Sequence, residues 1–131
     1  MRQIFLCDFS THYMMGDSCA VVRFTPKEFE NFLTMMKASE DDTNGADSDK
    51  FDSLIDSIEK KNKVSLYGVA QTPYSELIGK MSTKRVISIL KQGKNVSGEW
   101  EEGSFAFATT EKKAREAVMK IEAKHVCDGW F

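Results

Sequence analysis

Residues 25–36, TPKEFENFLTMM, determine the first helix of the fold. Thr25 suits the helix cap, Pro26 suits the first turn, and Glu28 stands where its carboxylate can reach back to the cap. Apolar side chains then recur at intervals of three and four residues, which places them on one side of a helix. These side chains are Phe29, Phe32, Leu33 and Met36. The stretch therefore predicts a helix over residues 25–38 with one buried face.

The same spacing predicts three more helices and separates them from runs that favour strands. The helical stripes are Phe51, Leu54, Ile55 and Ile58; Tyr74, Leu77, Ile78 and Met81; and Ala114, Ala117, Val118 and Ile121. Runs rich in valine, isoleucine or aromatic residues predict strands at 2–7, 18–24, 63–69, 84–91, 104–109 and 125–131. The expected fold class is α+β, with one mixed sheet of about five or six strands and three or four amphipathic helices packed on it.

Length and composition favour one domain over residues 1–131. With 41% hydrophobic residues, a chain of 131 residues can bury a core without metal or disulfide cross-links. No run of about eighteen apolar residues and no apolar leader is present, so we expect a cytoplasmic protein. Three cysteines are an odd number and too few for a secreted disulfide scaffold, which favours reduced thiols.

The charge of the chain is unevenly distributed. Residues 40–59 hold eight acidic residues against Lys50 alone, a net charge of −7, so the remainder of the chain carries +5 within the total of −2. Residues 40–49 predict a flexible acidic loop, and residues 92–103, polar and glycine-bearing, predict a second loop or long hairpin connection. A moderately basic body with an acidic segment can bind an anion, but it does not resemble a protein that coats duplex DNA.

Hydrogen-bonding groups gather where the first expected strand ends. After the apolar run 3–7 come a carboxylate, two hydroxyls, an imidazole and a phenol within six residues. They are Asp8, Ser10, Thr11, His12 and Tyr13. A turn needs fewer donors and acceptors than these, and loops at strand ends often carry binding groups. This cluster is therefore the first candidate for a ligand site.

The spacing of possible ligand residues can be compared with two kinds of metal site, a calcium loop and a zinc site. With Gly45 at the sixth position of a calcium loop, the twelfth position, which should hold a bidentate glutamate, is Phe51. A strand at 125–131 beside the first strand would bring together the cysteines and histidines near the termini, but no close pair among them has the usual zinc-ligand spacing. These residues are Cys7, His12, Cys19, His125 and Cys127. We therefore expect neither a metal nor a cofactor.

Covalent catalysis has little support in the pattern. Cys7 with His12 or His125, or Ser10 with His12, would supply a nucleophile and a base, but no glycine-flanked nucleophile turn is present. The chain also has no glycine-rich phosphate-binding motif of the GxxxxGK or GxGxxG type.

Residues 4–14, IFLCDFSTHYM, form an apolar run that leads into Phe-Ser and then Met. The capped helix from Pro26 follows, and Leu77-Ile78-Gly79, Lys84-Arg85-Val86 and Gly93 come later in the chain. In this order the motifs resemble a family of small dimeric viral ring nucleases, which act as type III CRISPR antagonists by binding and cleaving cyclic tetra-adenylate. That family has a similar opening strand, a capped helix in the same order, and Leu-x-Gly, Asn-Arg-Val and Gly at similar spacing.

The resemblance implies roles for particular residues. Ser10 and Thr11 would contact ligand phosphate or ribose, Arg85 would pair with a phosphate, and Glu111 would shape the pocket. The family's catalytic histidine follows a glycine, but here Gly68 is followed by valine. In metal-independent cleavage an imidazole can protonate the leaving oxygen, so the resemblance leaves His12 as a relocated acid or the chain as a binder that cuts slowly.

Each of these residues also has an ordinary structural interpretation. Ser10 can cap a turn, Arg85 can begin an edge strand that faces water, and Glu111 can stabilise a helix N-terminus.

Two hypotheses of function follow. The first is a viral or mobile-element defence antagonist, a homodimer in the host cytoplasm, that binds a cyclic oligoadenylate or a related cyclic nucleotide and sequesters it or cleaves it slowly. The second is a small acidic interaction protein without enzymatic activity, which inhibits a host defence protein or complex through residues 40–59.

Overall fold

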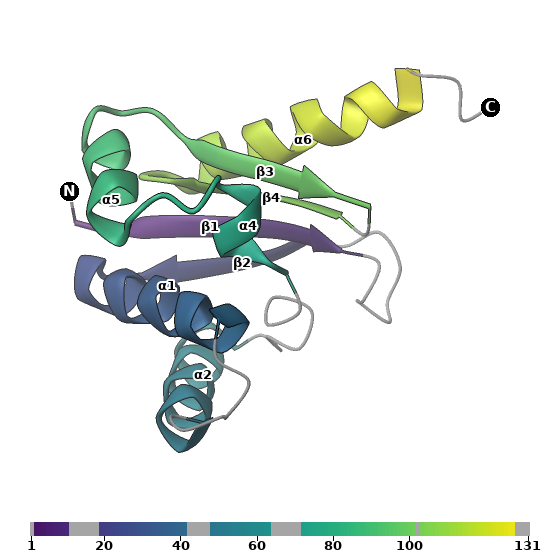
Figure 1. Cartoon of the computed structure of the whole chain (residues 1–131). Coiled ribbons are helices and arrows are strands. Elements are labelled where there is room, and N and C mark those ends of the chain that lie inside the picture. Colours follow the sequence, from purple (N-terminus) through teal and green to yellow (C-terminus); the bar gives the residue numbers. More distant parts are fainter. Residues whose placement is uncertain (1, 11–18, 42–47, 64–71, 102, 128–131) are drawn as a thin grey trace.

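The computed structural model describes residues 2–10, 19–41, 48–63, 72–101 and 103–127. Its elements follow in the order β1 (Ile4–Ser10), β2 (Cys19–Phe24), α1 (Pro26–Asp41), α2 (Ser48–Asn62), α4 (Tyr74–Leu77), α5 (Thr83–Lys91), β3 (Val96–Trp100), β4 (Gly103–Ala108) and α6 (Glu111–Cys127) (Figure 1). The described residues thus form an α+β fold, as the sequence predicts.

The described strands form one antiparallel sheet of four, in the order β2-β1-β4-β3. The central strand β1 pairs with β2 on one side, with Leu6 opposite Val22, and with β4 on the other, with Leu6 opposite Phe107. The expected mixed sheet of five or six strands is therefore wrong for the described residues. The strand expected at 63–69 falls, apart from Lys63, outside them.

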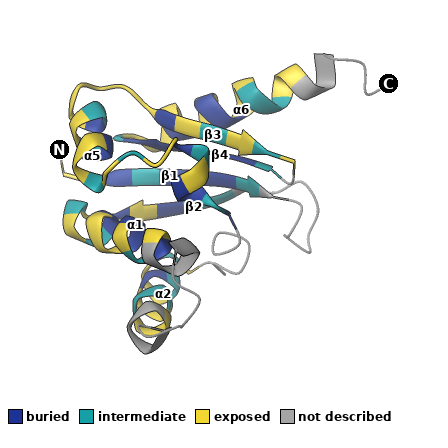
Figure 2. Ribbon diagram, viewed as in Figure 1, coloured by how far each residue is buried: buried dark blue, intermediate teal, exposed yellow. Residues whose placement is uncertain are grey.

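Helices cover the two faces of this sheet unequally. Side chains of β1 alternate, so that Ile4 and Leu6 join a core with the helices α1, α2, α4 and α5, whereas Cys7 joins a second core with α6. Figure 1 shows α6 on the far side of the sheet from α1. Burial colouring follows this arrangement, because the central strands β1 and β4 are mostly buried, whereas β3 and the outer sides of the helices are largely exposed or intermediate (Figure 2).

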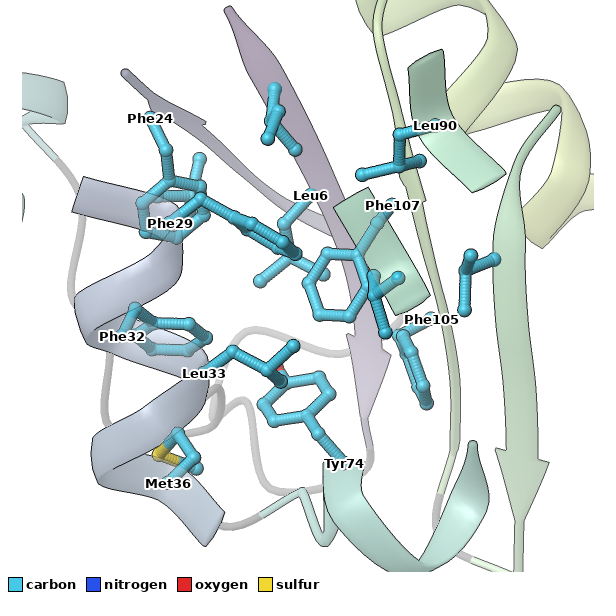
Figure 3. Close-up of a cluster of buried hydrophobic side chains, with 14 of the residues drawn as sticks. Leu6, Phe24, Phe29, Phe32, Leu33, Met36, Tyr74, Leu90, Phe105 and Phe107 are labelled. Atoms are coloured by element: carbon cyan, nitrogen blue, oxygen red, sulfur yellow. The ribbon is translucent and has the colours of Figure 1, made fainter. Parts of the chain in front are cut away.

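The larger core is built from aromatic rings. Its largest fully buried side chains include Phe24, Phe29, Phe32, Tyr74, Phe105 and Phe107. The ring of Tyr74 lies edge-on to Phe105, with ring centroids 4.8 Å apart, and also contacts Phe32 and Phe107 (Figure 3). Rings of this size bury much apolar surface, and edge-to-face pairs add about 0.5–1.5 kcal/mol each beyond it.

The start of α1 matches the sequence prediction. The backbone N–H of Thr25 donates to Oε1 of Glu28 at 2.8 Å, and the N–H of Glu28 donates back to Oγ1 of Thr25 at 3.2 Å. This reciprocal pair satisfies two amide groups that have no partner inside the helix. The predicted stripe of Phe29, Phe32, Leu33 and Met36 is buried, which confirms the assignment of its face.

Two segments have a different structure from the one predicted. Residues 84–91, expected as a strand, belong to the helix α5, and residues 96–100, expected within a loop, form β3. The side chain of Ser82 accepts a hydrogen bond from the backbone of Arg85 at 3.1 Å and so caps α5. Val86 and Leu90, four residues apart, are the buried residues of this helix, so a helical period overrides the β-branched composition.

The C-terminal strand expected at 125–131 is also wrong where it can be checked. Helix α6 runs through Cys127, and residues 128–131 lie outside the described residues. The helix expected at 74–81 is shorter, because α4 ends at Leu77 and both Gly79 and Lys80 have positive φ angles, 71° and 60°. This left-handed turn redirects the chain towards α5.

Candidate functional site

Asp8 is the only charged side chain among the fully buried polar residues that the structure describes, and it lies near the end of β1. It is 0% exposed, and its Oδ2 accepts a hydrogen bond from the hydroxyl of Tyr74 at 2.6 Å and another from the hydroxyl of Thr72 at 2.9 Å. Tyr74 is also fully buried, and Thr72 is 2% exposed. Hydroxyl donors are what a buried carboxylate needs, because an unpaired charge in a core costs several kcal/mol.

These hydrogen bonds connect Asp8 to residues that are far away in the sequence. Thr72 and Tyr74 come more than sixty residues later in the chain, and their bonds fasten the start of α4 to the centre of the sheet. The backbone of Asp8 pairs with Phe105 in β4, whose ring packs against Tyr74. We call Asp8, Thr72 and Tyr74 the buried carboxylate cluster.

The sequence predicts that the polar run follows a strand over residues 2–7, and this is wrong for its first residues, because β1 extends to Ser10 and includes both Asp8 and Ser10. The rest of the run lies at or beyond the edge of the described residues. Ser10 is the last residue of β1, opposite Gly103 of β4, and nothing is described of its side chain. Thr11 and His12 lie outside the described residues. Their predicted roles, ligand contact for Ser10 and Thr11 and acid catalysis for His12, stay predictions.

Arg85 lies on the exposed side of α5, among other cations. Lys84 and Lys91, seven residues apart, share one side of the helix, and Arg85 is adjacent to it. All three are exposed, and none forms an ion pair with any residue that the structure describes. The sequence has no acidic residue between Glu76 and Glu99. We call Lys84, Arg85 and Lys91 the cationic face of α5.

Glu111 already has a partner within its own helix. It is the first residue of α6, and its Oε2 accepts a hydrogen bond from Nε of Arg115 at 2.8 Å, an ion pair between positions i and i+4. An acidic residue in the first turn and a basic one a turn later both stabilise a helix, by about 0.3–1 kcal/mol at an exposed site. This geometry accounts for Glu111 without a ligand.

Arg85 and Glu111 lie towards the same end of the sheet, and Ser10 lies at the other. The ammonium group of Lys113, two residues after Glu111, donates to the carbonyl of Gly93 at 3.2 Å, so the loop after α5 contacts the first turn of α6. Ala108, which precedes that turn, is opposite Phe5 near the start of β1. The seven residues of β1 extend over roughly 20 Å, which separates Ser10 from these groups within one chain.

A second polar pair is present in the smaller core. Ser104, 1% exposed on β4, donates a hydrogen bond to Oε2 of Glu122 on α6 at 2.6 Å. The bond connects the C-terminal half of α6 to the sheet, beside a core built mostly from small side chains. The sequence gives no local signal for it, because the two residues are 18 positions apart on different elements.

The described residues offer no cluster suited to a metal. No group of three or more His, Cys, Asp and Glu side chains lies together within them. Cys7 of β1 is buried against α6 and is not part of a disulfide, and residue 127, expected in a terminal strand that would have brought Cys127 to it, is helical. The candidate calcium loop falls largely in 42–47, outside the described residues.

Comparison with other proteins adds no family. No model of a known protein family, no curated protein and no solved structure matches this chain at a significant level. Among the described helices, none combines the length and apolar character needed to span a membrane. The functional argument therefore depends on the cationic face of α5 and on the sequence motifs.

Proposed function

We propose that the protein binds a cyclic oligonucleotide messenger, of the cyclic oligoadenylate class, and acts as a viral or mobile-element antagonist of host defence. The observation that supports it most directly is the cationic face of α5. Cyclic oligonucleotides carry one negative charge at each phosphate, and exposed cations that form no ion pair and have no acidic neighbour along the sequence attract such a ligand and pair with it. Arg85 offers a planar fork of donors that matches a phosphate.

The proposal assigns different tasks to the two ends of the sheet. Arg85 and the neighbouring lysines hold phosphates, and His12, with Ser10 and Thr11, supplies a proton to the leaving oxygen during slow cleavage. Because the two ends are separated within one chain, both groups reach one ligand only if two copies share it, which fits the proposed homodimer in the host cytoplasm. Sequestration without cleavage needs only the cationic face.

Thermal shift with a panel of cyclic oligoadenylates and other cyclic nucleotides tests this function, followed by chromatography of the recovered ligand. A ligand that binds only the folded protein raises Tm by mass action. At a ligand concentration of a hundred times Kd, the free energy of unfolding rises by about 2.7 kcal/mol. Arg85→Ala should abolish the shift, whereas Lys120→Ala, an exposed lysine on α6, should retain it. No shift with any ligand of the panel would refute messenger binding.

His12→Ala then distinguishes cleavage from sequestration. If linear product forms with the unmodified protein and disappears with His12→Ala while the thermal shift persists, the imidazole acts in cleavage. If intact ligand is recovered from both proteins, the protein sequesters its messenger.

One observation favours a second function, inhibition of a host defence protein through residues 40–59. On α2, Asp52 and Asp56 are exposed one turn apart, while Ile58 is buried in the core. A helix that presents carboxylates outward can dock on a basic surface. Replacing Asp52 and Asp56 by asparagine should abolish host-protein binding and leave messenger binding unchanged, and Arg85→Ala should have the opposite pattern.

A further inference from the structure

The cations of α5 continue beyond the end of the helix. Residues 77–98 carry five basic residues and no acidic one. The five are Lys80, Lys84, Arg85, Lys91 and Lys94, and all are exposed. Helix α5 ends at Lys91, and Lys94 lies three residues further on, in the loop that leads to β3. The cationic surface is therefore longer than the face that the proposed function uses.

A hydrogen bond brings a lysine of α6 to the same loop. Nζ of Lys113 donates to the carbonyl oxygen of Gly93 at 3.2 Å, so this ammonium group lies beside the residue that precedes Lys94. Gly93 has a φ angle of 81°, a left-handed conformation that favours glycine at this turn. An ammonium group has three N–H donors, so Lys113 is held by the loop and keeps two donors for another acceptor.

The acidic residues at the start of α6 are each paired with a cation of the same helix. Oε2 of Glu111 lies 2.8 Å from Nε of Arg115, and Oε1 of Glu116 lies 4.0 Å from Nζ of Lys112. Lys113 forms no ion pair with any residue that the structure describes. We call the five residues that run from α5 over the loop to α6 the cationic path. They are Lys84, Arg85, Lys91, Lys94 and Lys113.

The cationic path is long enough for several phosphates of one nucleic-acid strand. Lys84 and Lys91 are seven residues apart in α5, which is about 10 Å along the helix axis. In duplex geometry the phosphates of one strand follow one another every 3.4 Å or so along the axis, so α5 alone spans about three of them. Lys94 and Lys113 extend the path past the end of the helix.

The segments that form the path contain nothing on which a base could stack. Neither residues 77–95 nor residues 109–116 include an aromatic side chain. Stacking on aromatic rings is a main source of affinity for bases in single strands, whereas contacts with phosphates carry no sequence information. A ligand held along this path is therefore recognised by its backbone.

The charges of the molecule are divided between the two edges of the sheet. Helix α5 contacts β3 at one edge, and α2 contacts β2 at the other, with Asp52 and Asp56 exposed. Figure 1 shows α1 between these two helices. The division leaves one edge able to attract a polyanion although the net charge of the chain is −2. A narrow path suits one strand better than a duplex, which presents its phosphates over a wider surface.

We propose that the cationic path binds a linear single strand of nucleic acid through its phosphate backbone, without preference for base. The inference goes beyond the proposed function, because it adds a second ligand and assigns roles to Lys94 and Lys113, which messenger binding does not use. Arg85 belongs to both surfaces, so a linear strand and a cyclic messenger should compete for it.

The salt dependence of binding counts the phosphates that the path contacts. Fluorescence anisotropy with labelled single strands of about twelve nucleotides, one of thymidylate and one of adenylate, measures the association constant across salt concentrations. Five contacts predict a slope of about −3.5 in log K against log salt concentration, equal for both strands. A slope near zero, or a large preference for one base, overturns the proposal. Binding of polyglutamate as tightly as either strand would assign the path to an acidic protein instead and also overturn it.

Two lysine substitutions locate the contacts. Lys94→Ala and Lys113→Ala should each weaken binding of both strands about fivefold at 0.1 M salt and reduce the slope by about 0.7, the contribution of one phosphate contact. Lys60→Ala, an exposed lysine at the end of α2, is the control and should bind like the parent protein. If Lys60→Ala loses as much affinity as Lys94→Ala and Lys113→Ala, the binding is not confined to the path.

The same variants separate this inference from the proposed function. Lys94→Ala and Lys113→Ala should retain the thermal shift with cyclic oligoadenylate, whereas Arg85→Ala should lose the shift and also bind the linear strands more weakly. A parent protein that binds linear strands and shows no shift with any cyclic nucleotide supports the path and refutes the messenger function. A parent protein that shows the shift and binds no linear strand overturns the path and leaves the messenger function standing.

Discussion

The buried carboxylate cluster and the cationic face of α5 both contain ionisable side chains, but in opposite environments. Asp8 is removed from solvent and accepts hydrogen bonds from Thr72 and Tyr74. Arg85 is exposed and has no ion pair within the described residues. A charged group that the fold has already satisfied stabilises the protein, whereas one left in solvent is free to meet a ligand. Substitutions should therefore separate the two regions by their effects on stability and on binding.

The largest expected effect on stability comes from Asp8→Ala. Removing the carboxylate leaves the hydroxyls of Thr72 and Tyr74 buried without this acceptor, and we expect a loss of about 2–5 kcal/mol in the free energy of unfolding. Urea denaturation followed by circular dichroism measures it. Tyr74→Phe, which keeps the ring contacts and removes one donor, should cost about 1.5–3 kcal/mol. Equal stability of the parent and Asp8→Ala would contradict the anchoring role.

Gly98→Ala tests whether α4, which carries Tyr74, is closely packed on the sheet. A Cβ at residue 98 would lie 3.0 Å from Cβ of Leu77 and from a ring carbon of Phe105, and 3.2 Å from the carbonyl oxygen of Leu77. Overpacking of this kind costs about 1–3 kcal/mol. Thermal unfolding should show the loss, and Ser97→Ala, one position along on the opposite face, should show almost none. A Gly98→Ala protein as stable as the parent would mean that α4 shifts freely.

Glu28 lies between the two extremes, since its side chain is partly buried between α1 and α2. Nζ of Lys61 donates to Oε1 of Glu28 at 2.6 Å. Burial raises the pKa of the Glu28 carboxyl, but hydrogen bonds from Lys61 and Thr25 and the charge of Lys61 outweigh it, so the pKa lies below its ordinary value of 4.5. A lowered folded pKa means that the stability contributed by ionised Glu28 is present above that ordinary value and is lost as the pH falls through the folded pKa.

The corresponding experiment compares Glu28→Gln with the parent protein across pH. At neutral pH the substitution should cost about 0.5–1 kcal/mol, and the difference between the two proteins should shrink as the pH drops below 4.5, where the parent carboxyl becomes protonated. Glu30→Gln, an exposed neighbour on the same helix, serves as the control. A difference independent of pH would show that the carboxylate charge does not contribute.

Arg85→Ala should have the smallest effect on stability. The guanidinium is exposed and without an ion pair in the described part of the chain, so the free energy of unfolding should change by less than about 0.5 kcal/mol. The same variant should lose the thermal shift with the messenger. Substitutions in the buried carboxylate cluster should leave that shift in place as long as the protein remains folded. A large loss of stability would place Arg85 among the structural residues instead.

Much of the fold could be predicted where the signal is local. The cap formed by Thr25 and Glu28 and the spacing of Phe29 and Phe32 are contained within a dozen residues, and the structure matches them. The strand predicted at 84–91 is wrong, and the reason for the prediction was that Val86, Ile87 and Ile89 are residue types that favour strands. Burial of Val86 and Leu90 at helical spacing, together with the cap at Ser82, decides for a helix. A helix cap and tertiary packing together outweigh the strand propensity of the individual residues.

The strand β3 was missed for a related reason. Its sequence, VSGEW, contains a glycine and two polar residues, which are typical of a loop. Gly98 is tolerated there because Leu77 of α4 and the ring of Phe105 occupy the space of a side chain. Only the packing of α4 reveals why a glycine stands in the middle of a strand.

By itself, the sequence determined the α+β class, the first helix, both strands of the first hairpin and the polar run that follows Asp8, because these depend on neighbouring residues. Only the tertiary structure decided that Asp8 bonds to Thr72 and Tyr74, that Arg85 and Ser10 lie at different ends of the sheet, and that Asn62 of α2 bonds to the backbone of Arg23 at the outer edge of β2. Contacts between residues far apart in the chain arise from how the elements pack, and the spacing of residues within one element does not specify them.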